Sequence, residues 1–208
     1  MVITKIEEHS KGKYKVYLND EFAFVLYHGE LRRFSMREGE QLADEVYHEI
    51  MNVILVKRAK LRAMHLLEKM DRTENDLRGK LKENLYPESA IEEAVRYVKS
   101  YHYVDDERYI REYISSHSYR MSMKEMQQKL IGKGVPKQLI MQVVEAMEPD
   151  ERRQESELVF SLMKKKCHNQ IPKTYEDKRR VYAYLMRKGF QMSDIEHAYR
   201  VFETQDVY

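Results

Sequence analysis

One short construction occurs three times in this chain, and it constrains the fold more than any other feature. A Ser or Thr is followed three residues later by an acid, at Thr73 and Asp76, Ser122 and Glu125, and Thr174 and Asp177. In this capping-box pattern the hydroxyl accepts a free N–H at the start of a helix, and the acid suits the positive end of the helix dipole. Each copy therefore predicts the start of a short helix.

The residues that follow these helix starts also repeat in register. Shifts of 49 and then 55 residues relate Leu81 to Leu130 and Leu185, and Ile91 to Ile140 and Ile195. The helix start itself moves by only 52 residues between the second and third copies. The second helix of the third copy is therefore predicted to be about one turn longer than its equivalents.

An amphipathic segment precedes each of these helices, and a third helix follows each turn. Apolar positions spaced by three and four residues form one stripe on each preceding segment. The stripes are Ala59, Ala63, Leu66, Leu67 and Met70; Ile110, Tyr113, Ile114 and His117; and Leu158, Leu162, Met163 and Lys166. Pro87 and Pro136 indicate the start of the third helix in the first two copies, and Ser193 with Glu196 predicts a capping box in the third.

The first part of the chain has a different pattern. VITKIEEH, KYKVYL and EFAFVLYH carry β-branched and aromatic residues in partial alternation, and a tight turn between Leu18 and Phe22 separates the last two segments. We expect residues 2–27 to form a small antiparallel sheet, and the chain to become helical from about Asp44.

The predicted fold is mainly α, with three tandem three-helix repeats and a small N-terminal antiparallel β segment. The expected limits are 1–43 for the β-rich segment and 44–104, 105–150 and 151–208 for the repeats. Units of this size have a thin core, so stacking on neighbours should add stability. Stacked repeats of this kind predict an elongated, curved array.

Composition excludes several classes of protein. No apolar run approaches the roughly 18 residues of a membrane span, and the first residues lack the apolar core of a signal peptide. A single cysteine, Cys167, excludes an internal disulfide framework. We therefore expect a cytoplasmic protein with no membrane contact. As a separate expectation, the chain is a monomer.

The search for catalytic chemistry finds one acidic cluster, Asp105, Asp106 and Glu107. Three carboxylates could hold Mg²⁺, but acids are also common at helix starts, and a helix is expected to begin near Arg108. The alternative, a metal-dependent nuclease, lacks the other convergent polar groups that a catalytic site needs. The chain also lacks an HExxH motif, paired Cys and His ligands, and a Gly-rich phosphate loop. We expect no enzyme activity, no cofactor and no metal.

Basic residues on the second helices are the candidates for partner binding. Because seven residues make almost two helical turns, Arg180 and Arg187 should lie on one face. Arginine offers bidentate contacts to phosphates and carboxylates, whereas a merely solvated basic face contributes little. The candidates are Arg179, Arg180, Arg187 and Lys188 in the third copy, and Arg78 and Lys82 in the first.

The overall charge does not indicate a nucleic-acid-binding protein, because 37 basic and 35 acidic residues give a net charge of only +2. Locally, however, residues 57–104 hold 11 basic and 8 acidic groups, and residues 151–208 hold 12 and 9. A helical-repeat protein that binds nucleic acid by itself is therefore one reading of the charge pattern. The net charge of +2 indicates, in contrast, that any direct DNA affinity is weak and salt-sensitive.

Three segments resemble the RecX family, bacterial regulators of the RecA recombinase. They are MDRTENDLRGKL (Met70–Leu81), IEEAVRYVKSYHYVDDERYIREYI (Ile91–Ile114) and LMRKGFQMSDIEHA (Leu185–Ala198). The chain departs from the pattern at two turns: His102 stands where the family usually has Gly, and Leu85 stands where the other two copies have Gly.

The resemblance implies a non-enzymatic regulator with three tandem three-helix repeats. It also implies that the protein binds in the groove of the RecA filament on single-stranded DNA and so affects recombination, DNA repair and the SOS response. The expected effect on RecA is inhibition, with stimulation as the other possible direction. The alternative function is a helical-repeat protein that binds nucleic acid without RecA.

Overall fold

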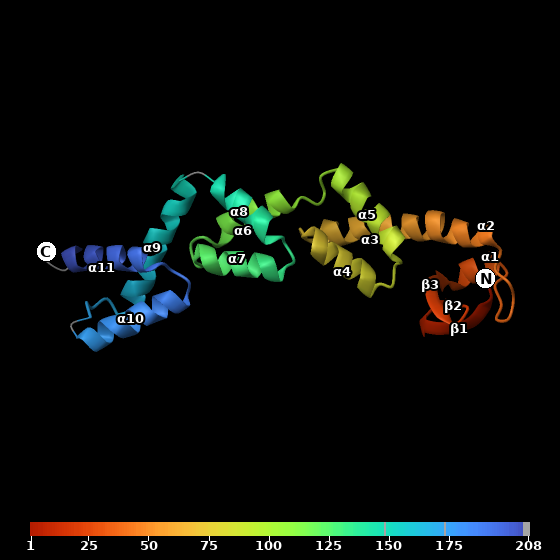
Figure 1. The fold of residues 1–208 in the computed structure, drawn as a ribbon, viewed down its shortest axis with the longest axis horizontal. Coiled ribbons are helices and arrows are strands. Elements are labelled where there is room, and N and C mark those ends of the chain that lie inside the picture. Colours follow the sequence, from red (N-terminus) through yellow and green to blue (C-terminus); the bar gives the residue numbers. More distant parts are fainter. Residues whose placement is uncertain (148, 173, 206–208) are drawn as a thin grey trace. The chain divides into compact units, whose positions relative to one another are not determined.

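The computed structural model describes residues 1–147, 149–172 and 174–205. The chain divides into two compact units, Met1–Asp105 and Asp106–Tyr208. It is mainly helical, with one small sheet at the N-terminal end (Figure 1). This confirms the expected fold class. The limits of the repeats at 43/44, 104/105 and 150/151, and their elongated, curved arrangement, stay predictions.

The N-terminal sheet consists of three antiparallel strands in the order β1-β2-β3. The strands are β1 (Ile3–Ser10), β2 (Lys13–Leu18) and β3 (Glu21–Tyr27). Between β2 and β3, Asn19 and Asp20 have φ angles of 49° and 68°. Two successive left-handed residues suit the twist of a tight hairpin, and Asn and Asp tolerate this conformation best after Gly. The sheet and its turn therefore confirm the sequence prediction.

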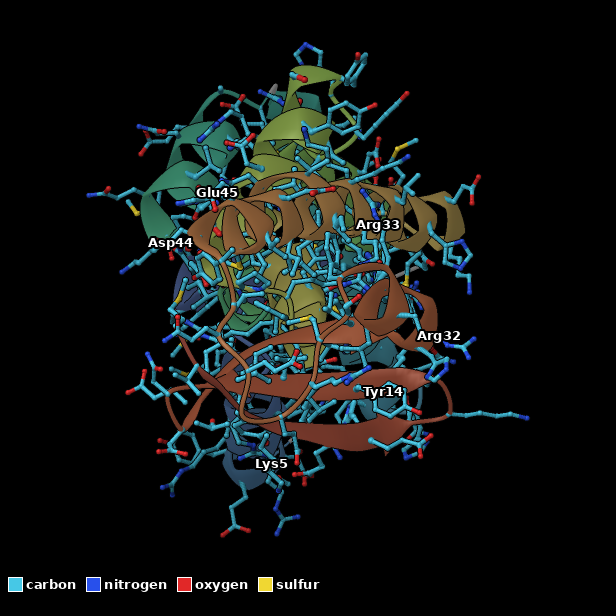
Figure 2. All side chains as sticks on the ribbon, turned by 90° about the vertical axis from the view of Figure 1, so that its right-hand side faces the viewer. Lys5, Tyr14, Arg32, Arg33, Asp44 and Glu45 are labelled. Atoms are coloured by element: carbon cyan, nitrogen blue, oxygen red, sulfur yellow. The ribbon has the colours of Figure 1, made fainter. Side chains whose placement is uncertain are left out.

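The sheet packs against the helix that begins at Asp44. This helix comprises α2 (Asp44–Glu49), a π-helical segment η1 (Ile50–Leu55) and α3 (Val56–Lys69). Buried Phe24 and Leu26 of β3 share one core cluster with Ile50 and Leu55. Figure 2 shows the helix over the sheet, with Asp44 and Glu45 at its first turn. A short helix that the sequence did not predict, α1 (His28–Arg33), follows β3 directly.

The first repeat is built from α3, α4 (Glu74–Glu83) and α5 (Glu88–Ser100). The second unit contains α6 (Asp106–His117), α7 (Met123–Gly132) and α8 (Lys137–Glu145), followed by α9 (Pro149–Lys166), α10 (Tyr175–Arg187) and α11 (Met192–Gln205). The equivalent leucines and isoleucines are all buried: Leu81, Leu130, Leu185, Ile91, Ile140 and Ile195. The register of the repeats is confirmed by this burial.

The three predicted helix starts are confirmed by their hydrogen bonds. Backbone N–H groups of Asp76, Glu125 and Asp177 donate to the hydroxyls of Thr73, Ser122 and Thr174 over 3.1, 3.2 and 3.1 Å. As predicted, α10 is longer than α4 and α7, with 13 residues against 10 in each of the others.

Two details of the helix predictions are wrong. Ser193 lies inside the first turn of α11, because the helix begins at Met192 and the carbonyl of Gln191 accepts the N–H of Ile195. Met70 is exposed rather than part of the buried stripe, because α3 ends at Lys69 and Met70 adopts an extended backbone.

The turns after the second helices share a left-handed backbone. Gly134 and Gly189 have φ angles of 81° and 96°, and Leu85 has a φ of 62° at the equivalent position in the first repeat. A side chain in this conformation costs roughly 1–2 kcal/mol relative to the right-handed region. The departure at Leu85 therefore leaves the shape of the turn unchanged but adds strain to it.

Ser122 connects the second and third repeats inside the second unit. Its hydroxyl caps α7 and also donates to the backbone carbonyl of Lys188 over 2.6 Å. A Cβ atom on Gly189 would lie 2.7 Å from Ser122 Oγ. Gly189 is thus required both by its positive φ and by the close approach of the neighbouring repeat.

Ser122→Ala is expected to destabilise the protein more than Thr174→Ala. Thr174 is exposed and caps α10, so its loss should cost about 1 kcal/mol. Ser122 is buried, and its loss also leaves the Lys188 carbonyl without this hydrogen bond, which should raise the cost to about 2–3 kcal/mol. Urea unfolding of both variants measures the difference. Equal losses would show that the contact with Lys188 adds nothing to stability.

Candidate partner-binding surface

Helix α10 presents the predicted basic residues on the outside of the third repeat. Val181 and Leu185 are buried one turn apart and so fix which face of α10 meets the core. Arg179, Arg180 and Arg187 are exposed. Lys188 follows as the C-cap residue and is half-buried. The structure therefore brings the four candidates of the third copy onto one helix and its end.

Arg180 and Arg187, seven residues apart on α10, differ in their surroundings. The Arg180 side chain is 74% exposed, and its guanidinium lies 4.0 Å from Glu176 and 3.6 Å from Asp177. Such exposed pairs contribute little and exchange readily for other partners. Arg187 has no carboxylate within ion-pair distance among the residues that the structure describes. Its guanidinium is therefore available for an anion.

Tyr184, on the same helix as these arginines, has two lysine ammonium groups near its ring. The ammonium groups of Lys166 and Lys188 lie 5.4 and 5.9 Å from the centroid of its ring. Both distances suit cation–π attraction. Together, Arg179, Arg180, Arg187, Lys188, Lys166 and Tyr184 are called the third-repeat basic surface below.

The sequence interpretation of Lys166 was wrong, and Tyr184 was not singled out. Lys166 was assigned to the apolar stripe of the helix before α10, but the side chain is exposed at the C-terminal end of α9. The run Lys164–Lys166 was the available signal, because cations are favoured in the last turn of a helix. Tyr184 had no signal in the sequence, since its role depends on lysines from two different segments.

In the first repeat, Arg78 belongs to an ion-pair network between α4 and α5. Its guanidinium lies 2.8 Å from Glu74, 2.6 Å from Glu92 and 3.9 Å from Glu88. The hydrogen bond from Arg78 lowers the pKa of the Glu92 carboxyl. Burial alone would raise the pKa of Glu74, but hydrogen bonds from Lys99 and Arg78 outweigh burial and hold it below the ordinary value.

The ion-pair network gives Arg78 a structural role in joining α4 to α5. The Lys99 ammonium adds a 2.6 Å contact to Glu74, so two cations and several carboxylates tie the two helices together. Lys82, one turn after Arg78, is exposed. Partner binding by Arg78 and Lys82 stays a prediction.

The acidic cluster is at a helix start, as the sequence indicated. Asp106 and Glu107 occupy the first turn of α6, and Asp105 immediately precedes it. In the part of the chain that the structure describes, no group of three or more His, Cys, Asp or Glu side chains is arranged to hold a metal ion. Within the same residues, no helix combines the length and the apolarity that crossing a bilayer requires.

Comparisons with known proteins find similarity to the RecX family along most of the chain. Residues 59–97 match a family model described as the first three-helix domain of RecX, and residues 154–199 match the third three-helix domain. The regulatory protein RecX of Caldanaerobacter subterraneus subsp. tengcongensis is 33% identical over 202 residues, covering 95% of this chain and 98% of that protein. The regulatory protein RecX of Clostridium beijerinckii is 28% identical, covering 90% and 89%.

Two solved structures have a similar fold. A crystal structure of a regulatory protein RecX superposes with a TM-score of 0.63 at 26% identity and covers 94% of this chain and 97% of its own. RecX from Lactobacillus salivarius gives a TM-score of 0.66 at 16% identity, covering 73% and 98%. The second comparison bears on the fold alone.

Arg78→Ala and Arg180→Ala are expected to differ in stability. The first change removes contacts to three carboxylates from a half-buried side chain and should cost about 1–2 kcal/mol. The second removes two exposed pairs and should cost less than about 0.5 kcal/mol. Denaturant midpoints of the two variants test this. A larger loss for Arg180→Ala would mean that the network contributes no stability.

Proposed function

Because this chain belongs to the RecX family of regulatory proteins, we propose that it inhibits the RecA recombinase by binding in the groove of the RecA filament on single-stranded DNA. The observation that carries the proposal is similarity along nearly the whole chain to curated regulatory proteins, at 33% identity over 95% of its length. RecX is a family of regulatory proteins and not of enzymes, which agrees with the expectation that this chain has no catalytic activity. We expect it to act as a cytoplasmic monomer.

The third-repeat basic surface is the proposed contact with the filament. A filament on DNA exposes phosphates, and arginine binds phosphates and carboxylates with two parallel hydrogen bonds. Arg187 has no carboxylate partner among the described residues, and the partners of Arg180 are exposed and exchangeable. Lys166 and Lys188 add two cations near the Tyr184 ring. These groups would meet an anionic surface without first breaking a buried ion pair.

Repeats in tandem offer a physical route to inhibition. Several weak contacts on one chain reinforce one another when all of them can engage at once. A chain that contacts more than one RecA subunit would hinder subunit exchange or block downstream partners. Inhibition would then occur below an equimolar ratio, because each bound chain affects several subunits.

The functional test is RecA activity in the presence of the purified protein. We expect DNA-dependent ATP hydrolysis and strand exchange to fall when the protein is added at a concentration well below that of RecA. Folded protein that leaves both activities unchanged at every ratio would disprove the proposal. A rise in RecA activity would still identify RecA as the partner, but the protein would then be a stimulator and not an inhibitor.

The contact surface is tested by reversing two charges, Arg180→Glu with Arg187→Glu. Both side chains are exposed, so the thermal midpoint should change little, while filament binding should weaken, and more at low salt than at high salt. The matched control is Lys11→Glu with Arg32→Glu, which changes the net charge equally at two exposed residues of the N-terminal segment. If both double variants bind alike at low salt, the third-repeat basic surface is not the contact.

A second candidate function, nucleic-acid binding without RecA, is favoured by the two lysine ammonium groups near the Tyr184 ring. Fluorescence anisotropy with single-stranded and double-stranded DNA over a salt series separates the two candidates. Tight binding to DNA alone, with no effect on RecA, would favour the second.

A further inference from the structure

Three tyrosines form a partly exposed cluster of rings where α5 ends. The rings of Tyr97 and Tyr101 have centroids 5.0 Å apart and are tilted by 58°, whereas those of Tyr101 and Tyr103 are stacked, with centroids 5.8 Å apart and planes at 16°. Tyr101 is 57% exposed and Tyr103 48% exposed, although both are large aromatic residues. Grouped exposed rings of this kind are typical of binding surfaces. These three residues are called the tyrosine stack below.

The backbone fixes the tyrosine stack in place. Tyr101 is the C-cap residue of α5, and His102 after it has a left-handed backbone with φ 55°. The N–H of His102 donates to the carbonyl of Lys99, and the N–H of Tyr103 donates to that of Val98, both over 2.9 Å. These two bonds are the Schellman arrangement that closes a helix end. Because the residues on both sides of His102 are already held, a ligand that contacts their rings would lose less free energy in ordering them.

One cation lies against the tyrosine stack, and Asp105 follows Tyr103 two residues later in the chain. The Lys60 ammonium lies 5.1 Å from the Tyr97 ring centroid, and no carboxylate lies within ion-pair distance of it among the residues described. The exposed neighbours on the last turns of α5 are Arg96, Lys99 and Ser100. Lys99 remains 53% exposed although it also contacts Glu74.

We propose that the tyrosine stack binds bases of single-stranded nucleic acid, with Lys60 and Lys99 near the phosphates. Stacked aromatic rings beside cations match the two parts of such a strand, its π-faces and its charged backbone. A single strand is required because the bases of a duplex stack on each other and hide their faces. This site goes beyond the proposed inhibition of RecA, and it would give the second candidate function, nucleic-acid binding without RecA, a specific place on α5 that is separate from the third-repeat basic surface.

The test is binding of a fluorescently labelled oligothymidylate to the full chain without RecA, followed by anisotropy. Tyr101→Ala with Tyr103→Ala should weaken binding at least about tenfold, because each stacked base contributes substantially to affinity. Tyr101→Phe with Tyr103→Phe keeps the rings and should bind like the parent protein. The control, Tyr119→Ala with Tyr175→Ala, removes two tyrosines that are also exposed and stack on no other tyrosine among the described residues, and should leave affinity unchanged. Circular dichroism and the thermal midpoint check that each variant is folded.

Three results would overturn the proposal: failure of the parent to bind the oligonucleotide at low salt, equal binding by the parent and the alanine variant, or a phenylalanine variant as weak as the alanine variant. Loss of RecA inhibition by the alanine variant, with oligonucleotide binding intact, would assign the tyrosine stack to a protein contact and would also overturn it. The proposed function is judged separately, because a parent that inhibits RecA but does not bind the oligonucleotide disproves only the tyrosine stack.

Discussion

Each three-helix repeat depends on burying one leucine of its second helix in the same cluster as the isoleucine of its third helix. Leu81 with Ile91, Leu130 with Ile140 and Leu185 with Ile195 belong to three separate cores. Helices of about ten residues are marginal by themselves, so they persist only when such a face is buried. The hydroxyl caps and left-handed turns then decide where each helix starts and ends. These features leave the outward positions free to differ between repeats.

The same scaffold therefore carries different surfaces. By the register of the leucines, the position of Arg78 corresponds to Gln127 and Tyr182, and the position of Arg187 corresponds to Glu83 in the first repeat. The first repeat uses its arginine in an ion-pair network that links two of its own helices. The third repeat instead leaves its arginines exposed at the surface. An internal network rigidifies a repeat, whereas exposed cations suit contact with an anionic partner.

The two proposed contacts differ in physical type. The third-repeat basic surface combines exposed cations with one ring that is half-buried, so its contribution should be mainly electrostatic and sensitive to salt. The tyrosine stack combines exposed rings with few cations, so stacking should dominate and salt should matter less. A regulator of a filament on single-stranded DNA could use both, since the filament contains protein, phosphates and bases.

The sequence by itself determined the features that depend on neighbouring residues. Local patterns predict the hydroxyl caps, the three strands and the register of Leu81, Leu130 and Leu185. A helix start, or the spacing of apolar residues that will be buried, can be recognised in a short stretch of sequence. The departure from Gly at Leu85 and His102 likewise marked two of the turns where a side chain occupies a left-handed backbone.

Only the tertiary structure decided which side chains from separate elements meet. Ser122 donates to the Lys188 carbonyl, Arg78 contacts carboxylates of two helices, and Lys166 and Lys188 both lie near the Tyr184 ring. The exposure of Met70 and Lys166 was missed for the same reason. A spacing of three or four residues gives the face of a helix, but the point where the helix ends and the neighbour that covers that face depend on packing between elements.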